Sequence, residues 1–153
     1  MPRAIPVHLG PRRTNQGPSF VDCPPVIDVH LSSEKDWSDD SGAIPKHDGR
    51  THAALIDTGA ENVFISSELA LELSFVGTSK ATVHGFGDTQ KVGATDIHII
   101  IPSQNIVFTS RAAITDLGLA GHTFSLVLGR SFLRHCRLEV DGPSNAYRLW
   151  WLP

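Results

Sequence analysis

The chain has 153 residues, which is enough for one domain with a hydrophobic core and too few for two ordinary domains. Hydrophobic residues make up 41% and charged residues 19%, a globular rather than a disordered composition. The formal net charge of −3 gives no basic footprint for nucleic acid, and no apolar run is long enough to span a membrane. The first residues lack the apolar core of a signal peptide, so we expect a cytoplasmic protein.

The pattern along the chain predicts an N-terminal arm followed by one domain. Residues 1–24 are rich in Pro, Gly and Arg, which is typical of a loosely held segment, with one short strand expected over 4–9. Residues 25–153 are expected to form a single domain. Apolar and polar residues alternate over 26–31, which predicts a half-buried strand, and the polar stretch 32–50 predicts a long loop.

The rest of the chain predicts a succession of short strands. A short helix is expected over 68–73, capped by Ser66 or Ser67, and a second over 131–135. Because strands outnumber helices so strongly, the predicted fold class is all-β with one or two short helices. The expected strands cover 51–56, 63–65, 81–84, 90–94, 95–101, 106–114, 126–128, 136–140 and 146–151.

Asp57 is the residue that most needs an explanation. It follows an apolar strand, opens the sequence Asp-Thr-Gly-Ala, and would be costly there unless its charge is paired or used. It could be a turn residue, a metal ligand or a catalytic carboxylate. Asp40 opens the similar sequence Asp-Ser-Gly-Ala, but no apolar strand leads into it, so we interpret Asp40 as a turn residue. The apolar residues before and after Asp57 carry the signal, not the tripeptide.

Residues 54–66, Gly85-Phe86-Gly87 and residues 126–130 together resemble, in this order, the retropepsin-like aspartic proteases. That group includes retroviral proteases and their cellular relatives. The resemblance covers about residues 51–151 and implies an acid-protease half-barrel that works as a dimer. A second predicted strand near the C-terminus makes the chain more similar to the cellular and bacterial relatives than to the short retroviral enzymes.

The resemblance implies that Asp57 is a catalytic carboxylate of an aspartic endopeptidase. In such enzymes two carboxylates share one proton, and together they activate the water that attacks the peptide bond. This chain offers one suitable aspartate, since Asp40 lies too close in sequence to belong to a separate lobe. The second Asp57 is therefore expected from another copy of the chain in a two-fold symmetric homodimer.

The same resemblance gives roles to the neighbouring residues. Thr58, Gly59 and Ala60 are expected to support the active site. Gly85, Phe86 and Gly87 are expected to form a flap over bound peptide, with an ordinary glycine hairpin as the alternative, and Leu128 and Gly129 are expected to cross behind the active-site loop. Glu61 and Arg130 are expected to form an ion pair, with the alternative that they make no contact.

The expected partners are a second copy of the chain and a peptide or protein substrate bound as an added strand. We expect no nucleic acid, no membrane and no cofactor, and the histidine spacing does not suggest a metal site. The alternative function is a catalytically inactive module of the same fold that dimerises or binds peptides. A further alternative is a precursor in which residues 1–50 block dimer assembly.

Overall fold

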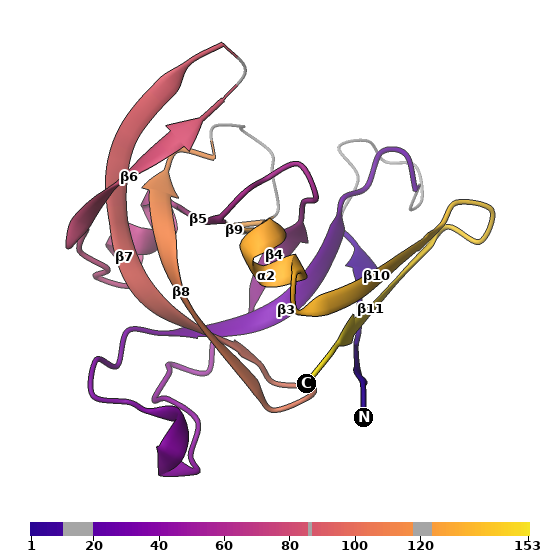
Figure 1. The fold of residues 1–153 in the computed structure, drawn as a ribbon, viewed down its shortest axis with the longest axis horizontal. Helices are drawn as coiled ribbons and strands as arrows, with labels where there is room; N and C mark the ends of the chain where they lie inside the picture. The colour runs from indigo at the N-terminus through magenta and orange to yellow at the C-terminus, as the bar shows by residue number, and fades with distance from the viewer. Residues whose placement is uncertain (11–19, 86, 118–123) are drawn as a thin grey trace.

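The computed structural model describes residues 1–10, 20–85, 87–117 and 124–153 of the chain. These residues form strands in two sheets, with two short α-helices and one 3-10 turn, η1 (Figure 1). The prediction of a mostly β fold is confirmed. The elements are β1 (Arg3–Ile5), β2 (His8–Leu9), β3 (Pro25–Ser32), η1 (Asp39–Ser41), β4 (His52–Ile56), β5 (Val63–Ser66), α1 (Ser67–Glu72), β6 (Ser79–His84), β7 (Thr89–Ile101), β8 (Ile106–Thr115), β9 (Leu126–Leu128), α2 (Arg130–Leu133), β10 (Cys136–Asp141) and β11 (Ala146–Trp151).

The larger sheet has the strand order β2-β3-β4-β9-β5-β8-β7-β6. The long strand β3 pairs with β4 through its first half and with β7 through its second half. Because one strand joins two distant members of the sheet, the sheet curves back on itself into a half-barrel, as Figure 1 shows. Within it, β4 and β9 run parallel, so their C-terminal ends lie together.

The smaller sheet joins the two ends of the chain, in the order β1-β11-β10. Arg3 lies opposite Trp151, and Ile5 lies opposite Leu149. The strands β10 and β11 form a hairpin, with Leu138 opposite Leu149. Ile5 and Leu149 are almost fully buried, so this sheet packs one face on the main core.

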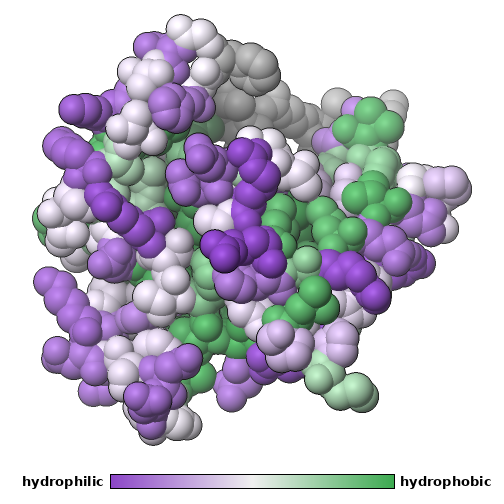
Figure 2. Space-filling view, in the orientation of Figure 1, coloured by the Kyte–Doolittle hydropathy of each residue, from purple (hydrophilic) through white to green (hydrophobic). Residues whose placement is uncertain are grey.

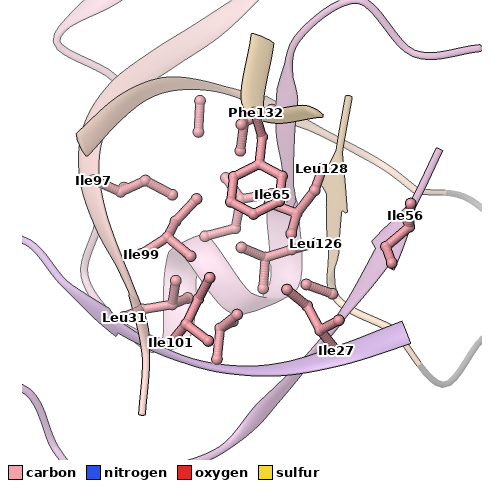
Figure 3. Close-up of a cluster of buried hydrophobic side chains, with 14 of the residues drawn as sticks. Ile27, Leu31, Ile56, Ile65, Ile97, Ile99, Ile101, Leu126, Leu128 and Phe132 are labelled. Atoms are coloured by element: carbon pink, nitrogen blue, oxygen red, sulfur yellow. The ribbon is translucent and has the colours of Figure 1, made fainter. Parts of the chain in front are cut away.

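The core is filled mainly by isoleucine and leucine from the inner faces of the strands. Alternate residues of β7 point inward, which is the expected behaviour of a strand with one buried face. The helix α2 closes this cluster with a fully buried phenylalanine. Figure 3 shows the side chains pointing toward one another: Ile97, Ile99 and Ile101 from β7, Ile27 and Leu31 from β3, Leu126 and Leu128 from β9, Ile65 from β5, and Phe132 from α2.

The helix α1 begins where the sequence predicts. The Ser66 hydroxyl accepts a hydrogen bond from the Leu69 backbone N–H at 3.1 Å, which satisfies one of the unpaired donors of the first turn. Leu69 and Ala70 face the core and are buried. The helix ends at Glu72, and Ser74 has a positive φ of 56°, which reverses the chain toward β6.

Several element boundaries differ from the sequence prediction. The strands expected over 90–94 and 95–101 are one continuous strand, β7, because no turn interrupts them and β8 pairs along the second part. The strand expected over 4–9 is divided at Pro6, which has no N–H to donate to a ladder, and its halves join different sheets. The second helix starts at Arg130 and ends at Leu133.

The described part of the first 24 residues is tied to the rest of the molecule. β1 pairs with β11 and β2 pairs with β3. Residues 33–51 contain no strand, and η1 is their one regular turn. Within the described residues, no helix has the length and apolar character needed to cross a membrane.

Candidate active site

Asp57 lies directly after β4, at the end that β4 shares with β9. Its backbone N–H donates to the carbonyl of Leu128 at 3.2 Å, so the residue is still attached to the sheet. Its carboxylate then turns back toward the chain that follows. The oxygen Oδ1 accepts the N–H groups of Gly59 at 2.8 Å and of Ala60 at 3.3 Å. Two backbone donors therefore fix the orientation of a partly buried carboxylate.

The second oxygen of Asp57, Oδ2, has no hydrogen bond to any of the described residues. One oxygen is thus held by two backbone donors, and the other makes no hydrogen bond to the described residues. A carboxylate in this arrangement can accept a proton from, or share a proton with, a group brought up from outside. The arrangement is suited to acid–base chemistry.

Gly129 lies against the loop that carries Asp57. A Cβ built on Gly129 would be 2.4 Å from the carbonyl oxygen of Asn62 and 2.7 Å from that of Ala60, far inside contact distance. The N–H of Arg130 donates to Ala60 O at 2.9 Å, and the N–H of Ser131 donates to the carbonyl of Glu61 at 3.0 Å. The chain after β9 is therefore hydrogen-bonded directly to the loop, at a separation that only glycine allows.

The side chain of Arg130 supports the same loop from outside. Its Nη1 donates to the carbonyls of Thr58 at 3.0 Å and Gly59 at 3.1 Å. Among the described residues it makes no ion pair with Glu61, whose side chain is exposed, so the ion pair expected from the sequence is not formed. Carbonyl oxygens near an arginine leave no signal in a sequence, so this contact was missed.

Asn62 was not among the site residues predicted from the sequence. Its carbonyl oxygen occupies the space beside Gly129 where a side chain would otherwise start. Asn62 contributes through its backbone, and any residue type could supply the same oxygen. The available signal was the glycine, which marks a close approach without identifying the group that approaches.

The glycine hairpin stands apart from these contacts, and Thr58 takes part in them only through its carbonyl. Thr58 and Gly59 are exposed. β6 and β7 form the hairpin, where Gly85 N–H donates to the Asp88 carbonyl at 2.9 Å and Gly87 has a φ of 83°. Phe86 lies outside the described residues. The structure thus gathers the Asp57 loop, β9 and the start of α2 into one cluster, and puts Gly85 and Gly87 at a separate hairpin tip.

No group of three or more His, Cys, Asp or Glu side chains suited to a metal ion occurs in the part of the chain that the structure describes. Cys136 is a half-buried thiol, and Cys23 is buried. Burial raises the pKa of the Cys136 thiol to about 12. His52, at the start of β4, is buried, and its Nε2 has no hydrogen-bond partner among the described residues. The pKa of His52 is lowered, first by burial and then by the nearby Arg50 charge.

Comparison with solved structures identifies the fold. A retropepsin-like aspartic protease from Rickettsia conorii has a similar fold, with a TM-score of 0.53 and 16% sequence identity, over 95% of this chain and 94% of that chain. The retroviral protease-like domain of Ddi1 from Leishmania major is also matched, with a TM-score of 0.40 and 13% identity, over 84% of this chain and 93% of that chain. None of the curated proteins compared with the chain matches it. The fold is that of the retropepsin-like aspartic proteases.

The family follows from the sequence itself. The model of the family described as "gag-polyprotein putative aspartyl protease" matches residues 46–135, which is more than half of the chain. The chain belongs to that family. The matched residues include the Asp57 loop, the β6–β7 hairpin and α2.

Proposed function

We propose that this protein is an aspartic endopeptidase that hydrolyses peptide bonds as a homodimer, with Asp57 of each copy forming the catalytic pair. One observation carries the proposal: Asp57 Oδ1 is fixed by the N–H groups of Gly59 and Ala60 while Oδ2 is left without a partner among the described residues. A carboxylate needed only for a turn would be fully explained by the Oδ1 contacts. The remaining oxygen is available to a partner carboxylate.

The chemistry follows from two such carboxylates brought close together. Two carboxyl groups about 3 Å apart cannot both ionise, because their negative charges repel. The pair therefore holds one proton between them and titrates as a unit. The ionised member takes a proton from a water, whose oxygen attacks the peptide carbon. The protonated member donates to the carbonyl oxygen as a tetrahedral intermediate forms. A proton then passes to the amide nitrogen as the C–N bond breaks, which leaves an acid and an amine.

The supporting residues have distinct tasks in this proposal. Gly129 allows β9 and α2 to hold the Asp57 loop, and Arg130 fixes the carbonyls of Thr58 and Gly59. The Thr58 hydroxyl, exposed in the single chain, would meet the second copy at the two-fold axis. The tip of the β6–β7 hairpin would close over an extended peptide and keep water out.

In this proposal the second copy would cover exposed apolar side chains. On the face shown in Figure 2, hydrophobic side chains gather on the side where β10 and β11 lie in Figure 1, and hydrophilic side chains dominate on the side of β6 and β7. Val140, on β10, is 55% exposed, and Leu152, which follows β11, is 39% exposed. Exposed apolar side chains of this kind gain free energy when a partner covers them.

The first test is cleavage of a peptide library at acidic pH by the wild type and by Asp57→Asn. We expect cleavage by the wild type and none above background by the variant, because Asn can neither take up nor release the shared proton. Cleavage that is unchanged in Asp57→Asn would overturn the proposal. A wild type that dimerises and binds peptides without cleaving them would instead establish the inactive binding module.

A mixing experiment tests whether the pair spans two copies. Wild-type protein is equilibrated with increasing amounts of Asp57→Asn at constant wild-type concentration, and the rate of cleavage is measured. If each site needs one Asp57 from each copy, mixed dimers are inactive and the rate per wild-type chain falls as the variant is added. A rate that stays constant at every ratio would show that one chain carries a complete site. Sedimentation of each mixture verifies that dimers have exchanged.

A further inference from the structure

A cavity of about 460 Å³ lies where the β6–β7 hairpin joins the body of the molecule. Its walls come from residues 33–37 of the long loop, residues 74–78 between α1 and β6, and the outer side of β7 and β8. Neither the Asp57 loop nor the glycines of the hairpin tip line it. It is therefore a different site from the candidate active site, and of the size that small ligands occupy.

The walls of this cavity are held by contacts within the protein. His98 uses both ring nitrogens: Nδ1 bonds the Thr109 hydroxyl at 2.8 Å, and Nε2 bonds the carbonyl of Glu34 at 2.9 Å. Trp37 packs edge-on against His98, with ring centroids 4.9 Å apart, and its Nε1 donates to the Ala43 carbonyl at 2.6 Å. The long loop is thereby fastened over β7 and β8, and the cavity is formed before any ligand arrives.

The lining combines apolar surface with an excess of negative charge. Trp37, Phe75 and Val76 supply two aromatic rings and an aliphatic side chain, and the lining is more apolar than polar. Two carboxylates, Glu34 and Asp96, line the cavity with one ammonium group, Lys35, and His98 has no free ring nitrogen.

The two carboxylates differ in how they are used. Asp96 is exposed and makes no ion pair with the residues that the structure describes, whereas Glu34 accepts the N–H of Lys46 at 2.6 Å. Arg111 stands opposite Asp96 in the β7–β8 ladder but donates to the carbonyl of Lys80, so the Asp96 carboxylate stays open to a ligand while Arg111 offsets part of its charge. Aromatic faces next to a free carboxylate favour a cation with an apolar body.

We propose that this cavity binds a small organic cation of the arylalkylammonium type. The aromatic part lies against Phe75 and Val76, and the ammonium group lies between Asp96 and the Trp37 ring. Lys35 opposes the cation from the rim, so the affinity depends on the balance between Asp96 and Lys35. A neutral molecule of the same shape gains the apolar contacts and loses the charge interaction.

The position of the cavity connects it to the hairpin. Residues 74–78 lead into β6, and Asp96 and His98 follow the part of β7 that pairs with β6. At this junction the Thr78 N–H donates to the Ala94 carbonyl at 2.9 Å. A ligand in the cavity therefore touches the segments at both ends of the hairpin. An effect of the bound ligand on hairpin closure over substrate would rest on the proposed function. The binding site itself does not rest on it.

Binding is tested with phenethylammonium and with 2-phenylethanol, its neutral counterpart, on the full chain. The readouts are the NMR signals of the Trp37 indole N–H and of the Phe75 and His98 amides. A ligand this small is expected to bind with a Kd on the order of 1 mM. We expect Asp96→Asn to weaken binding of the cation about three-fold and Lys35→Gln to strengthen it by about the same factor, with no change for the alcohol. Equal affinities for the cation and the alcohol would overturn the ligand class, and so would a cation affinity that neither substitution changes. NMR signals that do not shift with either ligand would overturn the site.

The connection to the hairpin is tested by hydrogen exchange at Thr78. We expect exchange of the Thr78 amide to slow several-fold when the cavity is saturated with phenethylammonium, while the buried amide of Ile27 in β3 is unchanged. Binding that leaves the Thr78 exchange rate unchanged would overturn the connection between cavity and hairpin, and the cavity would still be a binding site. Neither measurement depends on peptide cleavage, so a failure of the proposed protease function is distinguished from a failure of this site.

Discussion

The chain contains the pattern Asp-Ser/Thr-Gly-Ala twice, and the two copies have different surroundings. Asp40 lies in η1, is exposed, and its neighbour Ser41 bonds only locally, to Ala43. Gly42, which follows, has a φ of 67°, and a Cβ added there would meet no atom within 4 Å. Asp57 follows β4, accepts two backbone hydrogen bonds, and is attached to Leu128.

This difference indicates that the Asp-Ser/Thr-Gly sequence by itself supplies only a turn. The features of the candidate site come from residues distant in the sequence that pack on the turn. Both copies reverse the chain. At Asp57, residues 128–130 pack on the turn from the far side, although they are some seventy positions later in the chain. At Asp40, the turn lies in a loop of residues that contain no strand. The predictions below separate what the turn contributes from what the later residues contribute.

The largest effect is expected from the two aspartates themselves. Asp57→Asn should lower kcat/KM for peptide cleavage by about 10³-fold or more, because it removes the shared proton of the catalytic pair. Asp40→Asn, the matched control, should leave kcat/KM unchanged. Steady-state cleavage of one fluorogenic peptide measures both. A loss of activity of similar size in Asp40→Asn would mean that the comparison between the two turns is mistaken.

The next largest effect concerns the two glycines. Gly129→Ala places a Cβ against the carbonyls of Asn62 and Ala60, and relief requires movement of the backbone, so we expect a loss of about 3 kcal/mol or more in unfolding free energy. Gly42→Ala meets no atom and costs only the positive φ, about 1 kcal/mol. Urea denaturation of the two variants gives the comparison. Equal losses would show that β9 does not press on the Asp57 loop.

A smaller effect is expected from the arginine that holds the loop. Arg130→Met removes the donors to Thr58 and Gly59, and should lower the unfolding free energy by about 1 kcal/mol and kcat/KM by about ten-fold. KM should change less than kcat, because the substitution displaces Asp57 and leaves the β6–β7 hairpin in place. Arg148→Met, which removes surface ion pairs with Glu139 and Asp141, is the matched control and should change the unfolding free energy by about 0.5 kcal/mol or less and leave kcat unchanged. An Arg130→Met variant with normal kcat would exclude this positioning role.

The smallest effect concerns the pH dependence of the unfolding free energy and His52, which lies in the chain between the Asp40 turn and the Asp57 turn. His52 begins the strand that leads to Asp57, and Asp48, Arg50, Glu72 and His30 all act on it electrostatically. Its pKa is lowered in the folded protein, chiefly by burial, so below about pH 6.5 the unfolded chain binds a proton that the folded chain does not. The unfolding free energy should therefore fall as the pH drops below that value.

The control for this pH dependence is His52→Gln, which cannot take up the proton. Its unfolding free energy should depend less on pH than that of the wild type over the interval from about pH 7.5 to about pH 5.5. Guanidinium titrations at several pH values within this interval measure the difference. Identical slopes for the two proteins would show that His52 does not titrate differently in the folded and unfolded states.

Much of the fold could be predicted because its signals are local. Alternation over 26–31 marks β3, and a serine before an apolar helical pattern marks α1. The closure of the larger sheet could not be predicted, because it depends on β3 pairing with β7 through His30 to Ser32, and pairing between distant strands leaves no local pattern. The continuity of β7 was missed for the same reason, since its partners change along its length.

The candidate site divides in the same way. Asp57 and Gly129 could be found because a carboxylate after an apolar strand and a glycine after Leu-Val-Leu are visible in the sequence. The partners of Arg130 could not be found, because they are backbone carbonyls that every residue carries. The Glu61–Arg130 ion pair was expected from the family resemblance, and the alternative was that the two side chains make no contact. The structure shows that geometry favours the nearer carbonyls of the turn.

The pairing of β1 with β11 has a consequence for the way the chain folds. Arg3 finds its partner, Trp151, at the opposite extreme of the sequence. Closing so long a loop carries a large entropic cost, and the β1-β11 ladder repays little of that cost until the strands between them are in place. The pairing of β1 with the β10–β11 hairpin should therefore be the last part of the fold to form during refolding. Until then β11 presents one unpaired edge, and the half-folded chain is at its most vulnerable to aggregation.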